Sequence, residues 1–139
     1  MSFSRLIYHV IFHTLDKRPL ITESVEARLY PILSHLVLEY GGVQLAVGGV
    51  ESHIHLVCAM PVTATPSQFV RYLKSASSGR INRTLSMKEP FRWHAGYGIL
   101  TVNPHDLTRL LQYVAKQKEH HDRRTTTPHW EAPLANQSP

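Results

Sequence analysis

A predicted β-hairpin in the middle of the sequence constrains the fold of this chain most strongly. Residues 43–50 and 53–60 are both rich in apolar and β-branched side chains, and a tight turn at residues 49–52 joins them. Pro61 follows the second run and ends it, because proline has no backbone N–H for a β-ladder. The two runs therefore predict a pair of adjacent antiparallel strands.

The spacing of apolar residues predicts five further elements around this hairpin. They are a strand at residues 4–13, a helix capped by Thr22 that runs to Tyr40, a helix that starts at Thr65 and Pro66, a strand at residues 93–102, and a helix capped by Asn103 that runs to about His121. We expect the first strand to lie centrally in the sheet. Pro31 lies inside the first helix and predicts a kink or a break there, because it removes a backbone hydrogen bond.

The predicted order is strand, helix, strand, strand, helix, strand, helix. The first six elements match the split βαβ pattern of ferredoxin-like folds, an α+β architecture. We therefore expect a four-stranded antiparallel sheet with helices on one face, plus an extra C-terminal helix. The chain has 139 residues, which is the usual size of one domain. We place that domain at residues 1–122 and a polar tail at residues 123–139, which is loose unless Trp130 docks it on the body.

Composition excludes several classes of protein. Hydrophobic residues make up 42% of the chain and charged residues 18%, which is typical of a globular protein and not of a disordered one. The sequence has no apolar run long enough to span a membrane and no signal-peptide pattern, so we expect a cytoplasmic protein. The single cysteine, Cys58, lies in an apolar run and is interpreted as a buried structural thiol, not as a redox centre.

The positive charge of the chain is concentrated in one segment. The net charge is +5, and residues 71–92 account for all of it, because they contain six Lys and Arg residues and only one acidic residue, Glu89. Such a segment suits a polyanion such as nucleic acid, although a solvated helix face explains it equally well. The candidate phosphate contacts are Arg71, Lys74, Ser75, Ser78, Arg80 and Arg83.

His53 and His55 are the first candidates for a metal site. Alternate side chains of a strand point to the same face, so the two imidazoles lie about 6.6 Å apart on one face, at two strand rises. That spacing can chelate one ion, although two polar residues on a solvated strand face have the same pattern. Six other histidines have no partner at chelating spacing and are interpreted as structural or surface residues: His9, His13, His35, His94, His105 and His129.

A second polar cluster is predicted on the last helix. Gln117 follows Tyr113 by four residues and His120 follows it by seven, so the three side chains project from one helical face. Taken alone, a solvated helix face with a partly buried tyrosine also explains this spacing. The two clusters together are much more specific than either one.

Residues 8–121 resemble a known family. The hairpin ending in His53-Ile54-His55, the helix around Tyr72, the strand with Gly96 and Tyr97, and the pattern Tyr113-x-x-x-Gln117-x-x-His120-His121 are similar, in order and spacing, to the single-tyrosine HUH transposases of small bacterial insertion sequences, or IS200-like transposases. The resemblance implies that His53, His55 and Gln117 bind a divalent metal. It also implies that Tyr113, on the C-terminal helix, is the nucleophile, and His120 is a candidate auxiliary residue.

The chemistry of these residue types fits the implied activity. Two neutral imidazoles and a neutral amide leave the full charge of a Mg²⁺ or Mn²⁺ ion available to a phosphate, on which the ion acts as a Lewis acid. A tyrosine can hold a covalent phosphodiester, so a cut strand can be rejoined without ATP. We therefore predict a transposase that cleaves and rejoins single-stranded DNA at hairpin-marked element ends through a 5′-phosphotyrosine intermediate.

The resemblance also implies a homodimer, in which the Tyr113 helix completes the active site of the partner. No nucleotide cofactor is expected, because the sequence lacks a Walker-type glycine loop. Two alternative enzymes remain open: a domesticated enzyme that processes hairpin repeats, and an HUH replication initiator or relaxase. A non-catalytic nucleic-acid-binding regulator is a further alternative.

Overall fold

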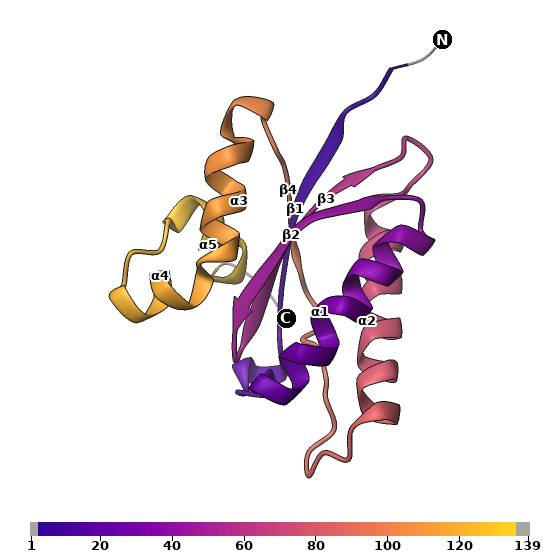
Figure 1. The fold of residues 1–139 in the computed structure, drawn as a ribbon, viewed down its shortest axis with the longest axis vertical. Helices are drawn as coiled ribbons and strands as arrows, with labels where there is room; N and C mark the ends of the chain where they lie inside the picture. The colour runs from indigo at the N-terminus through magenta and orange to yellow at the C-terminus, as the bar shows by residue number, and fades with distance from the viewer. Residues whose placement is uncertain (1–2, 136–139) are drawn as a thin grey trace.

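The predicted hairpin forms with the predicted bounds, as β2 (Val43–Val50) and β3 (His53–Met60). β1 (Leu6–His13) pairs antiparallel with β3 along its whole length, and β4 (Gly98–Thr101) pairs antiparallel with the other edge of β1. The strand order is β2-β3-β1-β4, so the first strand is internal, as predicted. This computed structural model describes residues 3–135 of the chain (Figure 1).

Helices cover both faces of the sheet (Figure 1). α1 (Glu23–Glu39) and α2 (Pro66–Thr84) lie on one face, where their apolar side chains pack on Ile54 and Leu56 of β3. The other face is covered by α3 (Leu107–Ala115), α4 (Gln117–Arg123) and α5 (Pro128–Ala135). Short 3-10 turns, η1 (Leu15–Lys17) and η2 (Pro104–Asp106), precede α1 and α3. The α+β architecture with a four-stranded antiparallel sheet is therefore confirmed.

No helix within residues 3–135 is both long enough and apolar enough to cross a membrane.

The first helix is continuous, so the break expected at Pro31 is wrong. Pro31 lies inside α1 on its exposed side. Proline has no N–H to donate to the carbonyl group four residues earlier, which belongs to Ala27, and Ala27 is also exposed. Water can therefore satisfy that carbonyl. Leu29 and Leu33, which are fully buried, hold the helix against the core on both sides of the proline.

The strand expected at residues 93–102 is shorter than predicted. Only Gly98–Thr101 forms a ladder, and Trp93 makes one isolated bridge to Thr14. Between them the chain leaves the sheet, because Lys74 donates hydrogen bonds to the carbonyl oxygens of His94 and Gly96. A side chain from α2 thus takes the place of a strand partner.

The last predicted helix is broken, so a single helix from Asn103 to His121 is a wrong prediction. Asn103 caps η2 as expected, since its side chain accepts a hydrogen bond from the His105 N–H. The break comes at Lys116, whose φ of −109° and ψ of 28° are not helical, and α4 begins at the next residue. Tyr113 and Gln117 therefore lie on different helices, on either side of a bend.

Trp130 docks the segment that follows α4 on the body of the protein. Its side chain packs on the small apolar cluster that includes Ile7, Val57 and Leu110. The indole ring also meets the Tyr113 ring edge to face, at 4.9 Å between centroids. Part of the expected loose tail is therefore a helix, α5, that lies over the sheet; residues 136–139 fall outside the described part of the chain.

Gly48 lets α3 approach the sheet closely. A Cβ atom built on Gly48 would lie 1.9 Å from the carbonyl oxygen of Val114, so no other residue fits without moving the helix. Gly48 is also the β2 neighbour of His55 in the register of the hairpin. The end of α3 that carries Tyr113 is therefore held directly beside the histidine strand.

Candidate active site

His53 and His55 lie on one face of β3, as their spacing predicts. Both side chains are buried, with their ring centroids 5.2 Å apart, while Ile54 between them points into the core under α1 and α2. The Nε2 atoms of the two imidazoles have no partner with good hydrogen-bond geometry among the described residues. These nitrogens face the side of the sheet that α3, α4 and α5 cover.

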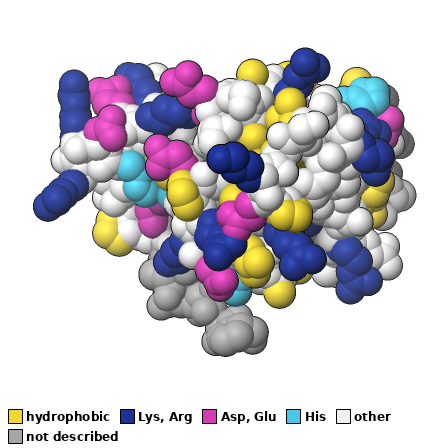
Figure 2. Space-filling view, turned by 90° about the horizontal axis from the view of Figure 1, so that it is seen from below, with side chains coloured by type: hydrophobic (Ala, Val, Ile, Leu, Met, Phe, Trp, Pro, Cys, Tyr) yellow, Lys and Arg dark blue, Asp and Glu magenta, His cyan; other side chains and the backbone are white. Residues whose placement is uncertain are grey.

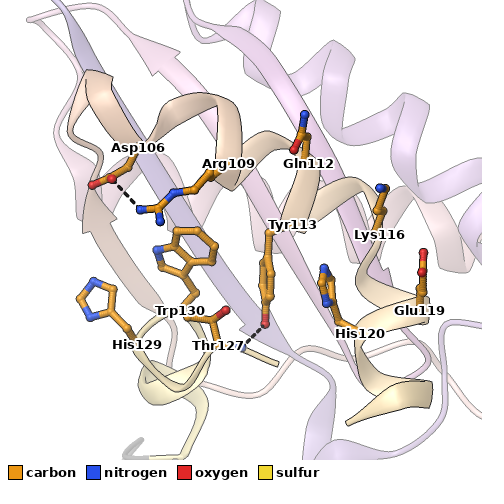
Figure 3. A pocket seen from close by; sticks show the side chains of 10 residues that line it. All are labelled: Asp106, Arg109, Gln112, Tyr113, Lys116, Glu119, His120, Thr127, His129 and Trp130. Carbon is orange, nitrogen blue, oxygen red and sulfur yellow. Dashed lines mark hydrogen bonds and ion pairs between the residues drawn. The ribbon is translucent and has the colours of Figure 1, made fainter. Parts of the chain in front are cut away.

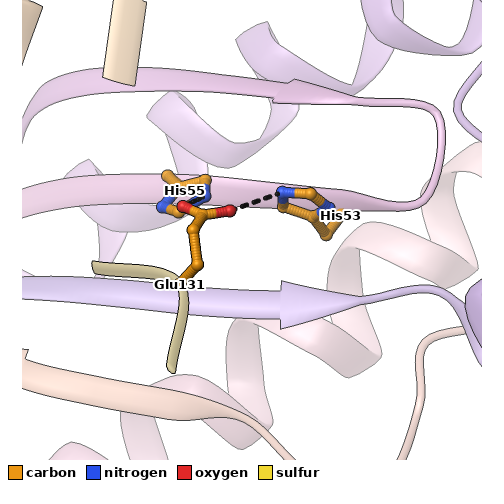
Figure 4. Close-up of side chains that lie close together, drawn as sticks. All are labelled: His53, His55 and Glu131. Carbon is orange, nitrogen blue, oxygen red and sulfur yellow. Dashed lines mark ion pairs between the residues drawn. The ribbon is translucent and has the colours of Figure 1, made fainter. Parts of the chain in front are cut away.

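The carboxylate of Glu131, from α5, lies between the two histidines (Figure 4). Glu131 Oε2 is 2.9 Å from His55 Nε2, and Oε1 is 3.4 Å from His53 Nε2. One donor atom from each of the three residues lies within 4.8 Å of the other two. This cluster of two imidazoles and one carboxylate can hold a divalent ion.

Tyr113 joins the same cluster through Glu131. Its hydroxyl group donates a hydrogen bond to Glu131 Oε2 at 2.9 Å and accepts one from the Thr127 N–H at 3.0 Å. Its ring stacks on the ring of His120 at 4.6 Å and lies 6.0 Å from that of His55. The tyrosine and the histidines of one chain therefore lie side by side.

A cavity of about 530 Å³ opens beside Tyr113, and Figure 3 shows the ring of that tyrosine between Trp130 and His120. Arg109, Lys116 and His129 are also among the lining residues. Aromatic and cationic side chains therefore surround the tyrosine, which suits the bases and phosphates of a nucleic acid.

Gln117 and His121 complete the polar cluster. Gln117 is 1% exposed, and its Oε1 atom lies 3.1 Å from His121 Nε2. The same His121 nitrogen is 3.2 Å from Glu131 Oε1, and the His121 ring is 4.8 Å from that of His53. Gln117 is therefore at the site, as predicted, but in this conformation its carbonyl oxygen is directed to His121.

Burial and hydrogen bonding set the protonation states of the cluster. Burial lowers the pKa of His55 and of His121, so both imidazoles are neutral and can offer a lone pair. Burial alone would raise the pKa of Glu131, but its close contacts with His53 and His55 bring that pKa well below its usual range. Burial raises the pKa of Tyr113 to about 12, so its phenol stays protonated at neutral pH.

The basic residues predicted to bind DNA lie on the other face of the sheet, on α2. Figure 2 shows that Lys and Arg side chains are spread over one face of the molecule, with acidic side chains among them. Arg71 and Arg83 are exposed, whereas Arg80 lies 3.8 Å from Glu39 and Lys74 is bound to backbone carbonyls. Lys74 therefore has a structural partner that the sequence does not reveal.

A second cavity lies beside part of this basic region. Lys74, Ser75, Ser78 and Arg92 line a cavity of about 450 Å³ together with His94. His94 stacks on His13 at 4.4 Å, and His13 is the register partner of His53. The cavity therefore lies beside the end of β1 that carries His13.

Comparison with known proteins identifies the family. The family model described as "Transposase IS200 like" matches residues 2–117, which include His53, His55, Tyr113 and Gln117. The chain belongs to the IS200-like transposase family. This transposase is therefore an enzyme of DNA strand cleavage and transfer, and the resemblance found in the sequence is confirmed. No curated protein matches its sequence.

Two solved structures share the fold of the transposase. A candidate transposase from Deinococcus radiodurans superimposes with a TM-score of 0.69 and 25% identity, over 81% of this chain and 91% of that one. A REP-associated tyrosine transposase bound to a REP hairpin gives a TM-score of 0.65 and 14% identity, over 87% of this chain and 74% of that one. The second likeness concerns the fold alone.

Sequence reasoning missed two residues at or beside the site of the transposase, Glu131 and His9. Glu131 falls in the segment expected to be a tail, and no spacing links it to the histidines. His121 is part of the motif found in the sequence, but its contacts with Glu131 and His53 are seen only in the structure. His9 has no chelating neighbour in the sequence, yet its ring contacts His55 across the sheet.

Proposed function

We propose that this transposase cleaves and rejoins single-stranded DNA with Tyr113 as the nucleophile. The observation that carries the proposal is the shared carboxylate: Glu131 contacts the Tyr113 hydroxyl and both imidazoles of the His53-x-His55 pair. Attack of the phenol oxygen on phosphorus forms a 5′-phosphotyrosine and releases the 3′-hydroxyl, which takes up a proton. Attack by a DNA hydroxyl reverses the step, so the bond energy is conserved.

We propose that a Mg²⁺ or Mn²⁺ ion is held by His53 and His55, with oxygen atoms of Gln117 and Glu131 as further ligands. Neighbouring ligands of an octahedral ion with bonds of about 2.1 Å lie about 3 Å apart, and the histidine–carboxylate distances of 2.9 and 3.4 Å are close to that spacing. When bound, the ion polarises the scissile phosphate as a Lewis acid. The Nε2 atoms of both histidines are buried, face the Glu131 carboxylate and make no hydrogen bond of good geometry with the described residues, which supports this assignment.

The residues around Tyr113 orient the nucleophile. Glu131 accepts the phenol proton in a hydrogen bond, and the Thr127 N–H donates to the same oxygen, so the lone pairs of Tyr113 have a fixed direction. That N–H also stabilises negative charge as the phenol loses its proton. His120 supports the ring by stacking, which is consistent with an auxiliary role.

We propose that the DNA substrate carries a hairpin. One structural neighbour is a tyrosine transposase bound to a REP hairpin, and the cavity beside Lys74 and Arg92 offers cationic side chains to a phosphate backbone. The same neighbour favours a second candidate function, the processing of chromosomal hairpin repeats, with the same site and chemistry. The homodimer with composite sites stays a prediction, because one chain is described and its Tyr113 lies beside its own His55.

Cleavage of a labelled single-stranded hairpin oligonucleotide tests the proposed function. With Mn²⁺, the protein is expected to give a protein–DNA adduct that survives denaturation, because the intermediate is a covalent phosphodiester. EDTA should stop the reaction, and the fully double-stranded form of the same DNA should not react. The hairpins flanking the gene and the repeats elsewhere in its genome are the two substrate sets that separate the candidate functions. Absence of any covalent adduct on all of them, despite hairpin binding, would favour a non-catalytic regulator.

The basic face of α2 gives a separate prediction for DNA affinity. Replacing Arg71 and Arg83 by Ala should weaken hairpin binding. It should also reduce the slope of log binding constant against log salt concentration by about 0.7 for each lost phosphate contact. Arg5→Ala, which removes an exposed cation just before β1, at the opposite end of that strand from His13, is the matched control. Lys74→Ala is a poor test, because Lys74 also holds residues 94–96 in place. An unchanged salt slope in the double variant would mean that these charges only face solvent.

A further inference from the structure

His9 is a buried polar residue whose ring contacts a proposed metal ligand. It lies on β1, is 1% exposed, and its Nε2 atom is 2.8 Å from Nδ1 of His55. The two rings are nearly parallel, with an angle of 26° between their planes. The other nitrogen of His9, Nδ1, is buried without a hydrogen-bond partner among the described residues. Among the described residues, the side-chain hydrogen bond of His9 is therefore the one to His55 Nδ1.

The contact has only two proton arrangements when both rings are neutral. An imidazole must be neutral to bind a cation through a ring nitrogen, and a neutral ring has its one proton at either Nδ1 or Nε2. In one arrangement His55 donates its Nδ1–H to His9 Nε2. In the other, His9 donates its Nε2–H to His55 Nδ1, and the proton of His55 is at Nε2, on the side of Glu131.

A metal ion selects between these arrangements. An imidazole nitrogen binds a cation through its lone pair, so an ion at His55 Nε2 requires the proton of that ring to be at Nδ1. Among the described residues, the hydrogen-bond partner of His55 Nδ1 is Nε2 of His9, and the His55 side chain is fully buried. Without an acceptor at that point, the liganding form of His55 would contain a buried, unsatisfied N–H.

We propose that His9 is a positioning residue, which accepts the Nδ1–H of His55 and so holds His55 in the tautomer and orientation that bind the metal. This inference rests on the proposed function, since it assigns a role towards the proposed ion. It also explains why a polar residue lies in an otherwise apolar part of β1: Val10, Ile11 and Phe12, which follow it, are all fully buried.

A pair of substitutions separates this role from simple packing. His9→Phe keeps a ring of similar size without an acceptor, and it should weaken Mn²⁺ binding about 10- to 100-fold, as is typical when an outer-shell partner is lost. His9→Gln can place its amide oxygen near the position of Nε2 and should restore affinity to within a few-fold of the wild type. Mn²⁺ affinity is measured on the DNA-free protein by electron paramagnetic resonance, so the result does not depend on cleavage.

Controls make each outcome informative. Cys58→Ala removes a fully buried side chain on the opposite face of β3 and should lower the melting temperature without changing Mn²⁺ affinity. If His9→Phe does not fold, His9→Leu takes its place. Equal Mn²⁺ affinity in the wild type and the variant without an acceptor would overturn the role of His9. If the wild type itself shows no binding that depends on His53, the proposed metal site fails instead.

Nitrogen NMR of the wild-type protein provides a test without any substitution. With the diamagnetic ion Zn²⁺, the ¹⁵N shifts of His55 should show a protonated Nδ1 and a metal-bound Nε2. The Nδ1 proton should also show a hydrogen-bond coupling to a His9 nitrogen. A metal bound through Nδ1, or an Nδ1 proton with no coupling to His9, would contradict the proposal.

Discussion

Tyr113→Phe is expected to abolish the covalent protein–DNA adduct and to lower strand cleavage at least about 1,000-fold, because it removes the phenol oxygen that we propose attacks the phosphorus. The phenyl ring keeps the stacking on His120 and the contact with Trp130, so the fold and hairpin binding should be retained. Gel electrophoresis under denaturing conditions measures the adduct, and an electrophoretic mobility shift measures binding.

Tyr72→Phe is the matched control for this experiment. It removes a phenol hydroxyl of equal chemistry, which donates to Glu39 on the other face of the sheet, far from the histidine pair. Its adduct yield should equal that of the wild type. An undiminished adduct in Tyr113→Phe would show that another tyrosine is the nucleophile, and peptide mapping of the DNA-linked fragment would then identify it.

Loss of either histidine of the His53-x-His55 pair is expected to have the second large effect. His53→Ala or His55→Ala should eliminate cleavage at any practical Mn²⁺ concentration, because an octahedral ion held by several ligands loses affinity steeply when an imidazole is removed. Hairpin binding should be nearly unchanged, since it depends on the exposed cations. Cleavage rates measured against Mn²⁺ concentration give both the affinity and the maximal rate. His35→Ala, which changes an exposed histidine on α1, is the matched control.

The two proposed oxygen ligands should differ in how much they contribute to metal binding. Gln117→Ala is expected to be milder than either histidine variant, because a water molecule can replace a neutral amide ligand. Glu131→Gln removes a negative charge beside the ion, so it should raise the Mn²⁺ concentration needed for half-maximal cleavage more than Gln117→Ala does. The reverse order would mean that Glu131 is not a ligand. Full activity of the wild type in EDTA would refute the metal site as a whole.

Glu131 connects the two halves of the active site in this conformation. Its carboxylate accepts the Tyr113 proton and also lies against both imidazoles, and α5 holds it there because Trp130 is packed on Val57 and Leu110. Residues 128–131 therefore belong with the catalytic body in the structure. The sequence offers no sign of this, because Glu131 is one acidic residue in a segment without periodicity.

The sequence alone determined those features that depend on local spacing. Alternation along a strand put His53 and His55 on one face, and the hairpin bounds were predicted residue by residue, because a period of two is set by backbone geometry. Tyr113 and Gln117 reached the same site even though the helix between them breaks at Lys116. A prediction from short-range spacing can therefore place side chains correctly even when the predicted end of a helix is wrong.

Only the tertiary structure decided which distant residues meet at those positions. His9 reaches His55 because β1 and β3 pair in one particular register, in which His9 is opposite Val57 and Ile11 is opposite His55. Lys74 shortens the last strand by binding carbonyl groups 20 and 22 residues further along the chain. Glu131 arrives at the histidines because one indole ring docks α5 on an apolar cluster on that face of the sheet. Contacts of this kind follow from packing and strand register, which are properties of the whole folded chain and leave no periodic pattern in the sequence.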